Sequence, residues 1–145
     1  MERRELLMGL GAAAMMGAGV GEAMAAQAAG AGVTDETVYE LRIYHLNEGK
    51  QEAIVDRFRT KEVAIFERLG MHGVAYWVAT DEPLAGRTPI YLLRHKSRAA
   101  ANESWAKFKV DAEWVALQAA TEKDGAFVTK SESTFMKLTD FSPKA

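Results

Sequence analysis

Residues 38–46 constrain the fold more than any other segment of the chain. They alternate strictly between two sets of side chains and are rich in aromatic and β-branched residues, which predicts a β-strand. One face of this strand carries Tyr39, Leu41 and Ile43, and the other carries Glu40, Arg42 and Tyr44. Because Leu41 and Ile43 are apolar, we assign their face to the helix-covered core and the polar face to the uncovered side of the sheet.

The segment after this strand predicts a helix over residues 50–69. Its apolar residues recur at helical spacing, and Lys61 and Glu62 interrupt that stripe, so a bend is expected there. Gly70 follows as the expected C-terminal cap, because glycine adopts the left-handed conformation without steric cost.

The remaining elements follow from the same signals. They are strands at 74–78 and 90–95, a helix after each of the caps Ser97 and Asp111, and a last strand within 127–138. The order is then β-α-β-β-α-β, which predicts an α+β, ferredoxin-like fold with a four-stranded antiparallel sheet and both helices on one face. An apolar and aromatic sheet face is costly to leave in water. We therefore expect it to pack on a second copy and form a dimeric α/β barrel.

Several short motifs together resemble the NIPSNAP family. They are Tyr39-Glu-Leu-Arg-x-Tyr44, Gly49-Lys50, Tyr76-Trp77, Trp105-x-x-Phe108-x-x-Asp111-x-Glu113-Trp114 and Asp140-Phe-Ser-Pro143. The resemblance covers about residues 38–143 and implies a ferredoxin-like dimeric α/β barrel. It implies no single reaction, since members are described either as monooxygenase-like or as protein-interacting domains.

Residues 1–28 differ in composition from the rest of the chain. Arg3 and Arg4 precede an uncharged run and then a small-residue segment, which is the arrangement of an export signal. The adjacent arginines resemble a twin-arginine signal, so we expect export to the periplasm or the extracellular space. The uncharged run is too short and too weakly apolar for a stable membrane span. We expect cleavage after Ala25 or Ala28, a lead-in over 29–37 and one domain over 38–143.

The polar strand face supplies the candidate site. Six candidate pocket residues are expected to line the barrel interior: Glu40, Arg42, Tyr44, Trp77, Tyr91 and His95. An arginine among aromatic rings can hold an anionic or carbonyl oxygen, and a neighbouring histidine can move a proton. We therefore expect the barrel to bind a small organic molecule, and an enzyme of this kind would be a cofactor-independent monooxygenase. The alternative is a non-catalytic interaction domain, in which Glu40 and Arg42 pair with their symmetry mates and the loop at 80–89 contacts a protein.

Charge and composition argue against several other functions. The 18 basic and 20 acidic residues leave no positive excess for nucleic acid, and the lack of cysteine excludes thiolate metal sites and disulfides. Strands one and three are expected to run parallel, which would gather the three histidines at one end of the sheet but on different faces. We therefore expect no metal site and no cofactor, and a haem would have only His95 as an axial ligand. The helical spacing of three aromatic residues is typical of core packing: Trp105, Phe108 and Trp114.

Overall fold

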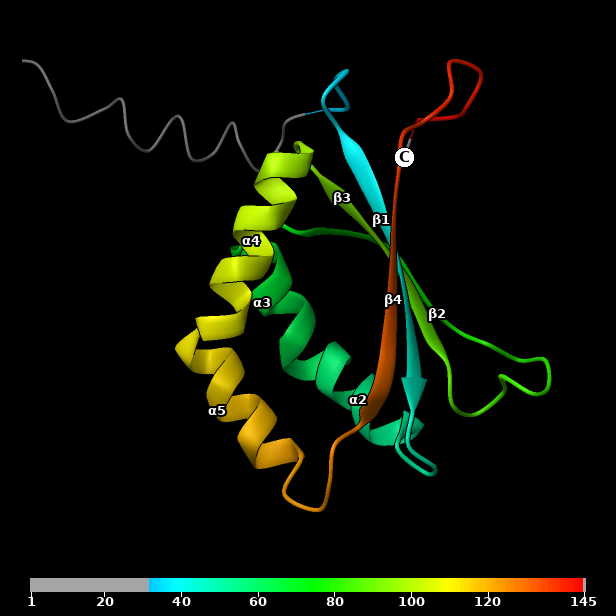
Figure 1. Cartoon of the computed structure of the whole chain (residues 1–145), viewed down its shortest axis with the longest axis vertical. Helices are drawn as coiled ribbons and strands as arrows, with labels where there is room; N and C mark the ends of the chain where they lie inside the picture. Colours follow the sequence, from blue (N-terminus) through cyan, green and yellow to red (C-terminus); the bar gives the residue numbers. More distant parts are fainter. Residues whose placement is uncertain (1–31, 145) are drawn as a thin grey trace, which may run out of the picture. The chain divides into compact units, whose positions relative to one another are not determined.

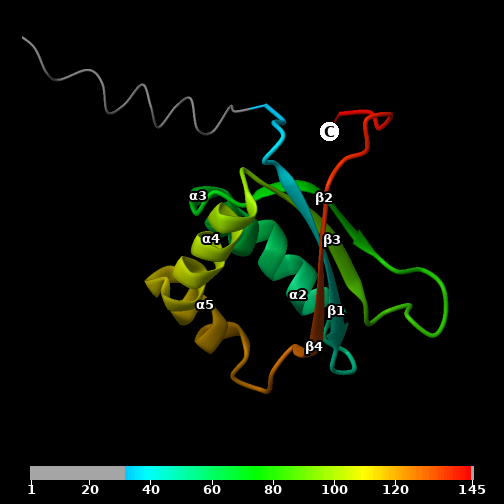
Figure 2. The ribbon, with the colours of Figure 1, turned by 45° about the horizontal axis from the view of Figure 1, so that its top comes forward.

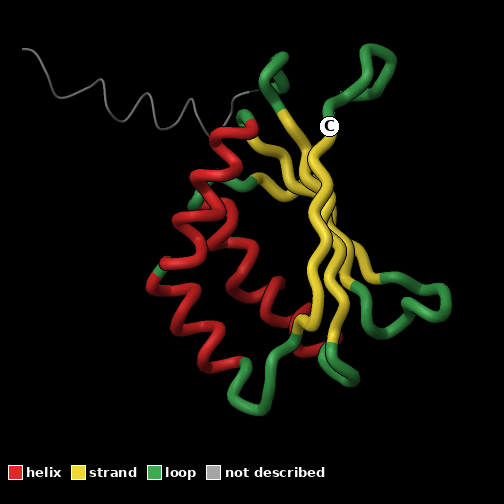
Figure 3. Tube along the Cα trace, viewed as in Figure 1, coloured by secondary structure: helices red, strands yellow, loops and turns green. Residues whose placement is uncertain are grey.

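The computed structural model describes residues 32–144, which fold into one layer of helices on one face of a sheet (Figures 1 and 3). In chain order the elements are β1 (Val38–Leu46), α2 (Gln51–Arg57), η1 (Phe58–Glu62), α3 (Val63–Arg68), β2 (His72–Val78), β3 (Pro89–His95), α4 (Arg98–Val110), α5 (Ala112–Thr121) and β4 (Val128–Met136). The sheet order is β2-β3-β1-β4, and each neighbouring pair is antiparallel. A second view shows the helices still on a single side (Figure 2). The predicted α+β, ferredoxin-like fold is confirmed. The predicted export signal at 1–28 and the start of the lead-in lie outside the described residues.

The expectation that strands one and three run parallel is wrong. β1 and β3 pair antiparallel, with Val38 opposite His95. Because β1 ends near His45, His45 and His95 lie at opposite ends of the sheet rather than together. The hairpin between β2 and β3 reverses the chain, so the third strand must run against the first in this topology.

The helix after β1 contains a π-helical turn at its centre. Helical conformation runs from α2 through η1 into α3, and η1 ends at Glu62. The predicted bend at Lys61 and Glu62 therefore corresponds to a turn with i→i+5 hydrogen bonding, which carries one extra residue. Gly70 ends this helical run with a φ of 86°, as the capping prediction required.

The two predicted N-caps are confirmed. The Ala100 N–H donates to Ser97 Oγ at 3.0 Å, and the Trp114 N–H donates to Asp111 Oδ1 at 3.0 Å. Each side chain satisfies a backbone donor that the first turn of its helix leaves without a partner. Among the described residues, no helix combines the length and apolar character that crossing a bilayer requires.

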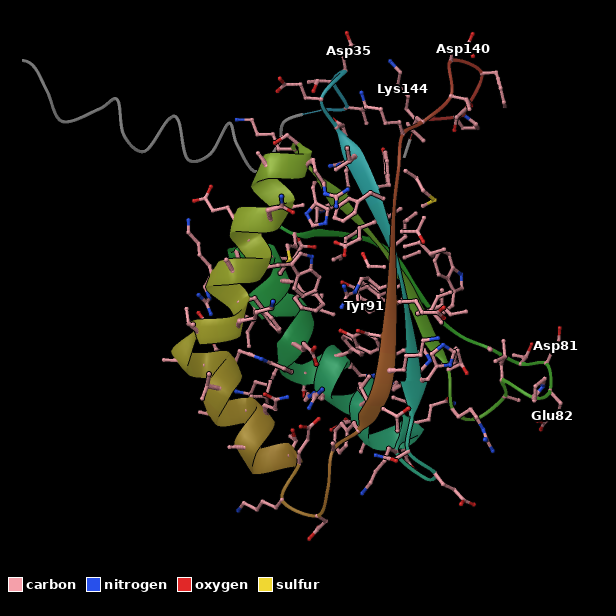
Figure 4. The ribbon with its side chains drawn as sticks, viewed as in Figure 1. Asp35, Asp81, Glu82, Tyr91, Asp140 and Lys144 are labelled. Atoms are coloured by element: carbon pink, nitrogen blue, oxygen red, sulfur yellow. The ribbon has the colours of Figure 1, made fainter. Side chains whose placement is uncertain are left out.

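The prediction of which face of β1 meets the helices is wrong. Glu40 and Tyr44 are buried, and their row includes Tyr91 of β3, which lies on the helix side of the sheet and contacts the ring of Phe66 in α3 (Figure 4). The apolar row of Leu41 and its neighbours faces the open side instead. The polar row can be buried because surrounding elements supply its hydrogen-bond partners. The assignment from sequence failed because the apolar residues of one strand carry no information about those distant partners.

A β-bulge decides which β2 side chains join the core. The register against β3 shifts between Gly73 and Ala75, so Tyr76 pairs with Tyr91 and Trp77 points to the open face. The rings of Tyr76 and Tyr91 stack at 5.6 Å with an interplanar angle of 17°. Gly73 makes room for this arrangement, because a Cβ there would lie 2.5 Å from the Tyr76 hydroxyl oxygen.

Replacing Gly73 by alanine is expected to push the Tyr76 ring off Tyr91 and to lower the free energy of unfolding by about 1 kcal/mol. Chemical denaturation of the wild type, Gly73→Ala, Tyr76→Ala and the double variant measures this. In the Tyr76→Ala background, Gly73→Ala should lower the free energy of unfolding by clearly less than in the wild type. Gly32→Ala is the control, since a Cβ at Gly32 meets nothing within 4 Å. An equal cost of Gly73→Ala in both backgrounds would contradict the assigned role of Gly73.

Candidate functional site

The carboxylate of Glu40 is the centre of a hydrogen-bond network between the sheet and the helices. Its Oε2 accepts from Trp105 Nε1 at 2.7 Å and from His95 Nε2 at 2.8 Å, and its Oε1 accepts from Ser133 Oγ at 2.7 Å and from Arg42 Nη1 at 3.2 Å. An ionised carboxylate only accepts, so His95 must carry a proton on Nε2. The four donors come from β1, β3, α4 and β4. One side chain therefore ties together three strands and a helix.

The same donors keep Glu40 ionised although it is only 1 % exposed. Burial would raise the pKa of Glu40. The hydrogen bonds from His95, Trp105 and Ser133, with the charge of Arg42, outweigh burial and lower the pKa to about 2.

Arg42 is held between this carboxylate and two aromatic rings. Its guanidinium carbon lies 4.6 Å from the centre of the Trp105 ring and 5.6 Å from that of Tyr44. Burial would lower the pKa of Arg42, but Tyr91, Tyr44 and Glu40 outweigh it and raise the pKa above its ordinary value. The guanidinium is therefore a permanent positive charge inside the fold.

A pair of tyrosines links this network to the two hollows beneath the helices. Tyr91 donates its hydroxyl hydrogen to Tyr44 Oη at 2.7 Å, and the rings meet edge-to-face at 5.3 Å. Burial raises the pKa of both phenols, so both are neutral at ordinary pH.

The first hollow is a groove of about 340 Å³ with mostly apolar and aromatic walls. It is lined by Val55, Phe58, Arg59, Val63, Tyr76, Trp77, Val78, Pro89, Ile90 and Tyr91. The second hollow is a smaller cavity of about 200 Å³ with a more polar lining. It is lined by Tyr44, Arg57, Glu62, Trp114, Gln118, Glu122, Ala126, Val128 and Ser131. Tyr91 belongs to the first hollow and Tyr44 to the second.

The structure brings five of the six predicted site residues to the helix side of the sheet and leaves one outside. The five are Glu40, Arg42, Tyr44, Tyr91 and His95, which sit beneath the helices rather than in the interior of a barrel between two sheets. Trp77 is 51 % exposed, and its backbone pairs with Ile90 in the apolar row of the open face. A role of these six residues in ligand binding stays a prediction.

Sequence reasoning missed two residues, Trp105 in the Glu40 network and Glu62 in the lining of the second hollow. The spacing of Trp105 suggested only core packing, and no sequence signal revealed that its indole N–H would meet Glu40. The signal for Glu62 was present, because a charged residue interrupts the apolar stripe of the first helix, and Glu62 is buried.

The loop after β2 lies away from the Glu40 network, as the positions of Asp81 and Glu82 show (Figure 4). Within residues 32–144, no three His, Cys, Asp or Glu residues are placed to share a metal ion.

Replacing Glu40 by glutamine is expected to lower the free energy of unfolding by about 3 kcal/mol at neutral pH, because Arg42 loses its buried counter-charge. The wild type should also lose stability as the pH falls from 4.5 towards 2, because the folded-state pKa of Glu40 lies below its unfolded value. Glu40→Gln should lack the part of this pH-dependent loss that comes from protonation of Glu40. Denaturant titrations across this pH range measure both effects.

Glu48→Gln is the matched control, since Glu48 is exposed in the turn after β1. It should leave the stability at neutral pH unchanged. Equal costs for the two substitutions would contradict the role given to Glu40.

Comparisons with known proteins agree with this fold. The NIPSNAP family profile matches residues 39–143. A NIPSNAP-like domain protein from Burkholderia xenovorans aligns with a TM-score of 0.66 at 16 % identity, over 76 % of this chain and 91 % of its own. A NIPSNAP family protein from Agrobacterium tumefaciens aligns with a TM-score of 0.63 at 25 % identity, over 74 % of this chain and 97 % of its own. The search of curated proteins gives no match. Because the family profile spans nearly the whole described domain, the chain belongs to the NIPSNAP family.

Proposed function

We propose that the chain binds a small organic molecule in the apolar groove between the first helical run and the β2–β3 edge of the sheet. One observation carries this proposal: a groove of about 340 Å³ whose walls are almost entirely hydrocarbon and aromatic. That volume lies in the range that ligand pockets occupy. Phe58, Tyr76 and Tyr91 form contiguous aromatic contacts along its floor, at 5.4 to 5.8 Å between ring centres.

The groove walls indicate the chemistry of the ligand. Flat aromatic faces favour a planar, apolar molecule, because stacking adds to the gain from apolar burial. Arg59 is the charged residue of the lining, and its side chain is 68 % exposed, so it stands at the mouth. A planar ring that carries one anionic substituent fits this arrangement. A cofactor-independent oxidation, one of the two activities described for the family, would need a ligand that itself reacts with oxygen.

2-Naphthoate is expected to bind in this groove, and filling the groove should prevent it. Val63→Trp places an indole inside the groove and should weaken binding at least about tenfold. Val115→Trp, at an exposed position on α5, is the control and should bind like the wild type. A fluorescence titration measures both affinities. Equal affinity for Val63→Trp and the wild type would place the ligand elsewhere and refute the proposal.

The open face of the sheet supports a second part of the proposal, that two copies of the chain pack through it. Leu41 pairs with Leu92 and Ile43 pairs with Ile90 across the two central strands, so four apolar side chains form a contiguous centre. Trp77 extends this apolar area to the edge of the sheet. A face of this kind is stabilised when a second copy covers it around a two-fold axis. The dimer remains a proposal, and it differs from the expected barrel in that its interior is apolar rather than lined by the Glu40 row.

Leu92→Glu is expected to convert a wild-type dimer into a monomer, because it would bury a carboxylate without a partner at the centre of the interface. Native mass spectrometry measures the mass of each species. Val110→Glu, on the exposed surface of α4, should remain dimeric. A wild-type monomer, or a dimeric Leu92→Glu variant, would contradict this interface.

Export of the chain and its arrival in the periplasm or extracellular space stay predictions. They rest on residues 1–28, which lie outside the described part of the chain.

A further inference from the structure

The polar cavity beneath η1 and α5 is separate from the proposed groove and has a different chemistry. It has a volume of about 200 Å³, and three of its lining residues are ionisable: Arg57, Glu62 and Glu122. Tyr44 adds a hydroxyl group from β1. Exposed residues at Gln118, Ala126 and Ser131 form its rim, so a small molecule can enter from solvent.

The π turn explains how Glu62 comes to face this cavity. Residues five apart lie on the same side of a π turn, as residues four apart do in an α-helix, but they lie on different faces of an α-helix. Arg57 and Glu62 are five residues apart, and Arg57 Nε donates to Glu62 Oε2 at 2.8 Å. Glu62 is 1 % exposed, so the extra residue of η1 places a carboxylate inside the fold.

Arg57 contacts several neighbours besides Glu62. Its Nη1 donates to Thr121 Oγ1 at 3.1 Å and to Glu122 Oε1 at 3.3 Å. Its guanidinium carbon lies 4.9 Å from the Trp114 ring centre and 4.7 Å from that of Phe127. One guanidinium therefore serves two carboxylates, and the cavity carries one net negative charge whenever both carboxylates are ionised.

Protonation of Glu62 removes this net negative charge. Burial raises the pKa of Glu62 to about 7, and the opposing effect of Arg57 is smaller, while Glu122 raises it further. The charge of Glu62 in turn contributes to the raised pKa values of Tyr44 from β1, Tyr91 from β3 and Tyr76 from β2, so all three phenols are neutral. Near neutral pH, Glu62 is therefore the group in this cavity that exchanges a proton.

We propose that this cavity binds a small organic cation with N–H donors, of the alkylammonium class, and that Glu62 and Glu122 receive its charge. Arg57 Nε donates to Oε2 of Glu62, and in the proposed complex Oε1 of the same carboxylate accepts an ammonium hydrogen. The step is an exchange: the cation binds, the protonated Glu62 carboxyl releases its hydrogen ion to solvent, and the net charge of the cavity stays at zero. This inference does not rest on the groove proposal.

Ethylammonium chloride is the probe, and isothermal titration calorimetry of the full chain is the measurement. At about pH 6.5, in two buffers of different ionisation enthalpy, binding should release protons, because the pKa of Glu62 is raised to about 7 and a bound cation favours its ionised form. Glu62→Gln should weaken binding at least about tenfold and abolish proton release. Glu132→Gln, which alters a carboxylate on the opposite face of the sheet, should behave like the wild type.

If Glu62→Gln does not fold stably, a second variant tests the same cavity. Ser131→Phe narrows the rim without touching the carboxylates and should also prevent ethylammonium binding. Wild-type affinity in either variant would overturn the proposal, as would no binding up to about 100 mM or tighter binding of propionate. The 2-naphthoate titration in Glu62→Gln should match the wild type, so failure of the cavity proposal is distinguishable from failure of the groove proposal.

Discussion

The buried carboxylate of Glu40 is the interaction on which the rest of the structure depends. A charge removed from water is tolerated only when donors surround it, and here the donors include side chains from β3, α4 and β4 as well as Arg42 of its own strand. Satisfying this one group fixes the position of α4 over the sheet and the direction of Arg42. It also explains why the polar row of β1, rather than the apolar row, faces the helices.

That orientation gives the two faces of the sheet different roles. The covered face holds a charged and aromatic layer, and the groove and the polar cavity open from it at separate places. The open face holds the apolar centre formed by Leu41 and its partner Leu92. The groove reaches the sheet edge, where Trp77 and Ile90 belong both to its lining and to the open face. The polar cavity lies on the covered side, so the proposed assembly leaves it accessible while it buries the apolar sheet.

Local signals predicted the fold well because each one acts within a few residues. The caps Ser97 and Asp111, the left-handed Gly70 and the alternation of β1 all have short-range physical causes. The covered face of β1 was predicted wrongly, because that choice depends on contacts with residues far away in the chain. The indole of Trp105 is the clearest case, since it is 65 residues from the carboxylate that it stabilises.

Thiol labelling tests the orientation of the sheet most directly, because the chain contains no cysteine. Leu92→Cys and Leu93→Cys place neighbouring probes on opposite faces of β3. The account predicts that the probe at Leu93 reacts slowly at every protein concentration, because Leu93 is fully buried beneath the helices. The probe at Leu92 should react slowly in concentrated protein and quickly once dilution separates the two copies. Faster labelling at Leu93 than at Leu92 in dilute protein would contradict the account, because it would put the apolar row under the helices.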